Sequence, residues 1–132
     1  MKFLIDTHTF IWFTEGSTEL SAVSRGILED MSNDFYISIS SLWEMSIKVG
    51  LGKLTLKVGD YAKVIDLVNE NGFQMLGINF SHTLENTKLP LHHRDPFDRI
   101  IIAQAIVENM DIISKDAIFD DYLSDKSVKR IW

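Results

Sequence analysis

The chain contains 132 residues, 45% of them hydrophobic, which is the size and composition of a single domain over residues 1–132 with one packed core. It has no cysteine, so disulfide frameworks, thiolate zinc sites and cysteine nucleophiles are excluded, and any metal must use oxygen or imidazole ligands. The net charge of −6 argues against a broadly basic surface for nucleic acid.

Short apolar runs alternate with stretches of helical periodicity. We predict strands at residues 3–5, 35–39, 73–78 and 111–114, and an edge strand over 128–132. Helices are predicted from Thr7 or His8 onward, over about 21–31, from a cap at Ser40 or Ser41 through Val49, over about 60–70, from a cap at Ser81 to Pro90, and from Pro96 through 107. No apolar run reaches the ~18 residues needed to cross a bilayer, so we expect a soluble, cytoplasmic protein without a membrane partner.

The alternation of strands and helices predicts the fold class. Strands linked by helices form right-handed βαβ crossovers and a parallel sheet that is covered on both faces. We therefore expect an α/β fold of three layers, α/β/α, with a central, mostly parallel sheet of four to five strands. Such sheets bind ligands beyond the carboxyl ends of their strands, where the following helices begin.

Four acidic residues fall at that edge of the predicted sheet. Asp6 ends the first strand and Asp116 follows the fourth, while Glu44 and Asp98 are predicted in the first turns of two helices. Two like charges about 4 Å apart repel by roughly 4 kcal/mol at an effective dielectric constant near 20, so four converging carboxylates need a counter-charge. A divalent cation supplies it, and oxygen ligands suit Mg²⁺ or Mn²⁺ better than zinc.

Each acid also has a purely structural explanation. Residues 41–44, Ser-Leu-Trp-Glu, fit a capping box, and Asp95 and Asp98 suit the start of a helix. Asp6 and Asp116 are ordinary turn formers by type, although helix capping alone does not account for Asp6. The coincidence of all four at one edge, with strongly apolar neighbours, favours the metal site.

Four segments carry a family resemblance. They read FLIDTHTFIW, SISSLWEMSIK, DPFDRIIIAQA and IISKDAIFDDY, in that order. In order, spacing and context they resemble the acidic motifs of the PIN domain, and within it the VapC-like toxins of toxin–antitoxin pairs. The resemblance runs from about residue 2 to residue 122.

The resemblance implies a site and an activity. Asp6, Glu44, Asp98 and Asp116 would be the catalytic, metal-binding acids, while Thr7 and Asp95 would support them from just outside. Family members are Mg²⁺- or Mn²⁺-dependent ribonucleases, so the cofactor would be Mg²⁺ or Mn²⁺ and water would attack the phosphodiester, leaving a 5′-phosphate and a 3′-hydroxyl. They are usually homodimers, and a cognate antitoxin places its C-terminal segment in the active-site groove.

Basic residues near the acidic motifs are candidates for binding RNA phosphates. They are His8, Lys48, His93, Arg94 and Arg99. The alternative is that they are solvated, or pair with nearby acids, and both explanations stay open for the two arginines.

Three aromatic residues also lie beside the acidic motifs. Trp12, Trp43 and Phe97 have the chemistry to stack on bases, but their spacing on amphipathic helices favours core packing. This preference is clear for Trp12, whereas both roles stay open for Trp43.

Two other functions fit the same residues. Asp6, at the end of the first strand, suits the nucleophile of a phosphatase or phosphotransferase, but the chain lacks a second acid two residues later. The other alternative is a non-catalytic PIN-like binding module whose acids only cap helices. Metal titration separates these, because only a metal site predicts that Mn²⁺ stabilises the protein and that Asp6→Asn or Asp98→Asn removes the effect.

Overall fold

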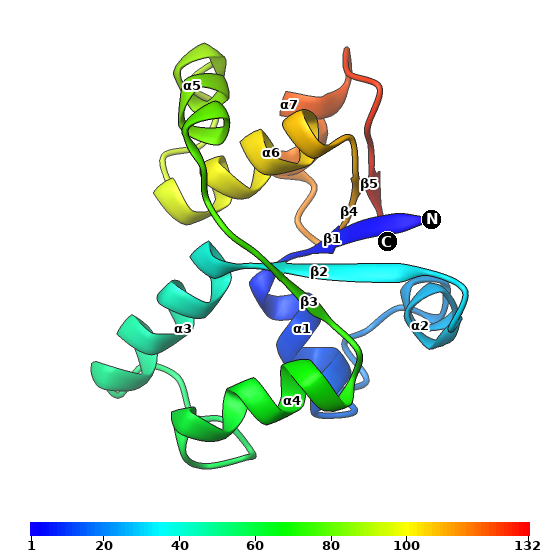
Figure 1. The fold of residues 1–132 in the computed structure, drawn as a ribbon, viewed down its shortest axis with the longest axis vertical. Coiled ribbons are helices and arrows are strands. Elements are labelled where there is room, and N and C mark those ends of the chain that lie inside the picture. The colour runs from blue at the N-terminus through cyan, green and yellow to red at the C-terminus, as the bar shows by residue number, and fades with distance from the viewer.

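Five parallel strands form the centre of the molecule, in the order β3-β2-β1-β4-β5 (Figure 1). The computed structural model describes residues 1–132. The strands are β1 (Lys2–Ile5), β2 (Asp34–Ser38), β3 (Gln74–Leu76), β4 (Asp111–Ile113) and β5 (Arg130–Ile131). Every neighbouring pair is parallel, so the carboxyl ends of all the strands lie at one edge, as predicted.

Seven α-helices cover the two faces of this sheet. They are α1 (Thr7–Thr14), α2 (Ala22–Glu29), α3 (Ile39–Gly50), α4 (Val64–Glu70), α5 (Phe80–Lys88), α6 (Pro96–Glu108) and α7 (Ile118–Leu123), with a 3₁₀ turn at Tyr61–Lys63 before α4. Figure 1 shows α1 to α4 on one side of the sheet and α5 to α7 on the other. The predicted three-layer α/β/α architecture is confirmed. No helix has both the length and the apolar character to span a membrane.

The core has two parts, one on each face of the sheet. Because side chains alternate along a strand, Ile5 and Ile113 pack with the helices on one face, while Leu4 and Ile112 pack with those on the other. All four side chains are fully buried. The ends of β1 and β4, which lead into the acidic edge, are therefore held rigidly from both sides.

Two helices begin earlier than predicted. Ser38, not Ser40 or Ser41, caps α3, because its hydroxyl accepts from the Ser40 amide and the helix follows β2 without a loop. Asn79, not Ser81, caps α5 in a capping box with His82.

The predicted start of α6 holds, but the predicted bounds of β3 do not. Asp95 caps α6 and Pro96 is its first residue, as predicted. Strand β3 is shorter than predicted, since it ends at Leu76 and the carbonyl of Gly77 accepts from the Gln104 side chain of α6 instead of a strand.

Candidate metal centre

The acidic edge begins where β1 passes directly into α1. Asp6 is the N-cap of α1, because its Oδ1 accepts from the Thr9 amide at 2.8 Å. Its Oδ2 accepts from the Ser114 hydroxyl at 2.5 Å, which joins the end of β1 to the residue after β4. Capping therefore accounts for one oxygen of Asp6 but not for the other, which accepts across the sheet edge, so helix capping alone does not explain this residue. The side chain is only 7% exposed.

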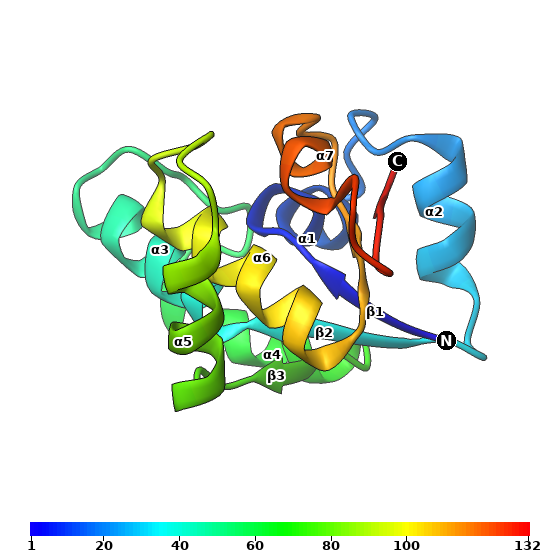
Figure 2. The same cartoon turned by 90° about the horizontal axis from the view of Figure 1, so that it is seen from above.

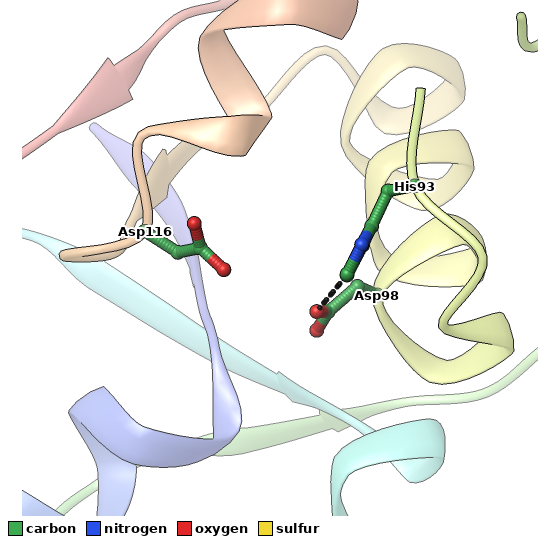
Figure 3. A group of neighbouring side chains, drawn as sticks. All are labelled: His93, Asp98 and Asp116. Atoms are coloured by element: carbon green, nitrogen blue, oxygen red, sulfur yellow. Dashed lines mark hydrogen bonds and ion pairs between the residues drawn. The ribbon is translucent and has the colours of Figure 1, made fainter. Parts of the chain in front are cut away.

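Asp98, Asp116 and His93 form a group of side chains that are close enough to hold a metal ion together. One ligand atom from each lies within 4.8 Å of the other two. Figure 3 shows the Asp116 carboxylate in the loop after β4. It faces Asp98, which lies in α6, and His93, which lies in the loop before α6. His93 Nε2 lies 2.8 Å from Asp98 Oδ2. Asp116 is fixed in its loop because its own amide donates to Ser114 Oγ and its Oδ1 accepts from the Ile118 amide.

Glu44 lies in the second turn of α3, not the first. Because Ser38 begins the helix, the predicted capping box over residues 41–44 does not form. Glu44 Oε1 accepts from the Thr7 hydroxyl at 2.8 Å, and Oε2 pairs with Lys48 Nζ at 2.7 Å. The carboxylate is buried, and a hydroxyl and an ammonium satisfy its hydrogen bonds. It does not cap the helix, which was the structural alternative.

The electrostatics of the edge reflect crowding of negative charge. The pKa of Asp98 is raised to about 6, mainly by burial. The hydrogen bond with His93 lowers this pKa in part, and the nearby charges of Asp95, Glu44 and Asp6 contribute to the increase. Burial also raises the pKa of Asp6, against the hydrogen bonds from Ser114 and Thr9. Both raised pKa values mean that the metal-free fold disfavours the ionised forms of Asp6 and Asp98.

The four predicted acids are thus near one another but not equally close. Asp6 and Glu44 do not join the 4.8 Å group, yet both act electrostatically on Asp98. Asp6 and Asp116 line one cavity of about 190 Å³. Each carboxylate oxygen has two lone pairs, so the hydrogen bonds to Asp6 leave sites open for a cation.

The donor set fits a hard divalent ion. Four carboxylates and a single imidazole suit Mg²⁺ or Mn²⁺ better than Zn²⁺, which prefers nitrogen and sulfur. A positive ion at this edge would also remove the repulsion that raises the pKa of Asp98.

Asp95 and Thr7 lie beside the acids. Asp95 caps α6 by accepting from the Phe97 amide at 2.9 Å, and its charge raises the pKa of Asp98. Thr7 is buried and orients Glu44.

The basic residues predicted to bind RNA occupy different environments. His8 and Arg94 are exposed, and Arg94 forms no ion pair with Asp95. Lys48 is paired with Glu44. Arg99 donates to the carbonyls of residues 86, 89, 90 and 93 and to the Tyr122 hydroxyl, so its guanidinium organises the loop before α6.

Sequence reasoning missed three contributors to this site. Ser114 bridges Asp6 and the Asp116 loop; a hydroxyl residue at the end of a strand was the available signal. His93 was assigned to RNA and not to Asp98. Tyr122 Oη accepts from the His93 amide at 2.6 Å, a contact across 29 residues that no local pattern predicts.

Comparison with known proteins identifies the family. A model of the PIN domain matches residues 3–123 of the chain. The chain belongs to the PIN domain family. No curated protein matches the sequence.

This PIN domain shares its fold with the VapC toxins of VapBC toxin–antitoxin systems. A chain of VapBC2 from Rickettsia felis, bound to a DNA fragment from its promoter, matches at TM-score 0.73 and 16% identity over 99% of this chain and 98% of that chain. DNA-bound VapBC from Salmonella typhimurium matches at TM-score 0.70 and 15% identity over 99% and 97%. VapBC-5 from Mycobacterium tuberculosis matches at TM-score 0.64 and 18% identity over 98% and 97%. At such identities the likeness establishes the fold, which confirms the predicted PIN-like architecture.

Proposed function

We propose that residues 1–132 form one PIN-like domain that acts as a Mg²⁺- or Mn²⁺-dependent endoribonuclease, the toxin of a toxin–antitoxin pair. The observation that carries the proposal is the crowding around Asp98. Its pKa is raised to about 6 while Asp116 and His93 stand within 4.8 Å, an arrangement that calls for a cation. The PIN family supports a nuclease over other uses of such a cation.

The acids and their neighbours have distinct parts in this proposal. Asp6, Glu44, Asp98 and Asp116 would hold the ion. When bound, such an ion lowers the pKa of a coordinated water toward neutrality and neutralises charge that develops on the phosphate. Ser114, Thr7 and His93 each hydrogen-bond one of these carboxylates and so fix its orientation.

The decisive experiment is cleavage of defined RNAs with Mg²⁺ or Mn²⁺, with mapping of the ends produced. We expect 5′-phosphate and 3′-hydroxyl ends, inhibition by EDTA, and a loss on the order of 100-fold or more in Asp6→Asn. Asp34→Asn is the matched control, since Asp34 is an exposed acid at the start of β2, at the edge of the sheet opposite the acidic edge. Cleavage that survives EDTA, or that leaves 2′,3′-cyclic phosphates, would overturn the proposal.

The phosphatase alternative is weakened by the surroundings of Asp6. Its two oxygens accept from Thr9 and Ser114, and the side chain is buried, so it is a poor in-line nucleophile. Acid-stable incorporation of phosphate into the protein would restore that alternative. The binding-module alternative predicts no change in stability with Mn²⁺.

We also propose a homodimer and a cognate antitoxin as partners, together with the RNA substrate. Exposed apolar side chains on β3 and α5 support the dimer, because Met75, Phe80 and Leu84 are 50%, 79% and 47% exposed. Figure 2 shows α5 at the periphery of the molecule. Light scattering should give twice the monomer mass for the wild type and the monomer mass for Phe80→Ser.

A further inference from the structure

A small cavity opens next to the proposed metal ligands. It has a volume of about 190 Å³ and is lined by Asp6, His8, Trp12, Lys115 and Asp116. Sites for drug-sized ligands typically measure about 300–1,000 Å³, so this cavity suits a single planar group and not an extended ligand. Because two proposed metal ligands form part of its wall, whatever occupies it lies beside the metal centre.

Trp12 gives this cavity an aromatic wall that is held in place. The indole is half-buried and packs against the core, and Trp132 contacts it edge-on with ring centroids 5.9 Å apart. His8 lies against it at 5.5 Å and a tilt of 32°. A rigid aromatic surface at a phosphodiester-cleaving centre is the chemistry that stacks on a nucleobase, and every base has a face that it accepts.

Lys115 adds a positive charge to the same cavity. Its ammonium lies 5.7 Å from the centre of the Trp12 ring. It also pairs with Glu19 at 3.0 Å, but both side chains are about half exposed, at 54% and 55%. An ion pair exposed to this degree contributes little, so a phosphate can compete for the ammonium.

We propose that this cavity holds one base of the RNA substrate, stacked on Trp12, with an adjacent phosphate at Lys115. The inference rests on the proposed nuclease function and extends it, because it names the residues that position the nucleotide next to the cut. The site combines an apolar ring, a cation and a neighbouring metal centre, which matches the base, the phosphate and the scissile bond of one nucleotide. Stacking reads no sequence, so this contact serves affinity and register more than base identity.

A purely structural role for Trp12 makes a different prediction. If the indole only packs against Trp132 and the core, its replacement lowers the stability of the protein without regard to which bases the RNA carries. The test must therefore vary the protein and the RNA together.

The experiment is a double-mutant cycle between Trp12 and the bases of a short RNA. An abasic residue is placed in turn at each position flanking the cut, and KM and kcat are measured with Mg²⁺ for the wild type and Trp12→Leu. We expect Trp12→Leu to raise KM on the order of tenfold for intact RNA. One abasic position should cost the wild type a similar factor and cost Trp12→Leu nothing more, while Trp12→Phe keeps most of the affinity.

Tyr36→Leu is the matched control. Tyr36 is a partly buried aromatic with an ammonium over its ring, that of Lys2 at 5.9 Å, but it lies in β2 and does not line the cavity. Its replacement should leave KM unchanged for every RNA.

Binding measured separately from cleavage distinguishes the two proposals. Anisotropy of the same RNAs, fluorescently labelled and read immediately after mixing with Mg²⁺, gives Kd. If RNA is cut but Trp12→Leu and the abasic substitution change KM independently, the proposed base site is wrong and the nuclease proposal is supported. If RNA is not cut but one abasic position weakens binding only when Trp12 is present, the base site stands and the nuclease is wrong. Without cleavage and without such binding, both are wrong.

Discussion

His93 and Asp98 form a hydrogen-bonded pair at the entrance to α6, with His93 Nε2 2.8 Å from Asp98 Oδ2. The bond favours the ionised carboxylate, yet burial and the neighbouring acids outweigh it and raise the pKa of Asp98 to about 6. The charge of Asp98, which lies close to Asp116 and His93, is therefore disfavoured in the metal-free fold.

Asp98→Asn should stabilise the metal-free protein at neutral pH. Because the folded-state pKa of about 6 exceeds the ordinary 3.8, the favourable contribution of Asp98 is complete below about pH 4 and is lost as the pH rises through 6. Allowing for partial exposure, the loss is ~2 kcal/mol. In EDTA, unfolding by urea should show the variant more stable than wild type at pH 7.5 and equal to it near pH 4.

Mn²⁺ should make the wild type more stable than Asp98→Asn at neutral pH. Mn²⁺ is expected to raise the melting temperature of the wild type and not of Asp98→Asn, since a ligand stabilises only the state that binds it. Equal stabilisation of both proteins, or a variant less stable than wild type in EDTA at pH 7.5, would contradict a metal centre at Asp98.

Thr7→Val should weaken metal binding through Glu44. Valine keeps the shape of threonine but removes the hydroxyl that donates to Glu44 Oε1 at 2.8 Å. Loss of such an orienting contact typically lowers metal affinity by about 10–100-fold and stability by about 1–3 kcal/mol. Isothermal titration calorimetry with Mn²⁺ measures the affinity.

Thr14→Val is the control for Thr7→Val. Thr14 lies in the same helix, and its hydroxyl donates only to helix carbonyls, those of Phe10 and Ile11. Its replacement should leave the Mn²⁺ affinity unchanged, and an equal change in both variants would mean that Thr7 acts only through the stability of α1.

Tyr122→Phe should loosen the loop that carries His93. The buried Tyr122 hydroxyl accepts from the His93 amide at 2.6 Å, so its removal leaves a main-chain donor without a partner, at a cost of about 1–3 kcal/mol. We expect a lower free energy of unfolding together with weaker Mn²⁺ binding, measured by urea denaturation and calorimetry.

Tyr61→Phe separates these two effects. The Tyr61 hydroxyl donates to the Leu42 carbonyl at 2.7 Å and contacts neither Asp98 nor His93. This variant should lose stability and keep its Mn²⁺ affinity. If Tyr122→Phe behaves in the same way, Tyr122 does not position His93.

The sequence predicted the architecture well because its signals are local. Apolar runs marked the strands, and Asp95 followed by Pro96 marked the start of α6. It was less accurate where neighbouring residues compete for one role. Three serines, at 38, 40 and 41, are equally suited to cap α3, and only the end of β2 decides among them.

Contacts across the sheet edge were beyond prediction for a related reason. The bond from Ser114 to Asp6 spans 108 residues and follows from strand order, which periodicity does not reveal. The pairing of His93 with Asp98 depends on a loop held by Arg99 and Tyr122, so it follows from tertiary packing and not from the motif itself.

The central position of β1 in the sheet has a consequence for synthesis on the ribosome. Although β1 is made first, Asp6 meets Ser114 only when β4 has emerged and paired with it. A nascent chain carries Asp6 and Glu44 well before it can align Asp98 and Asp116 beside them. Under the proposed nuclease function, this strand order would keep the polypeptide inert while its own messenger is still being translated.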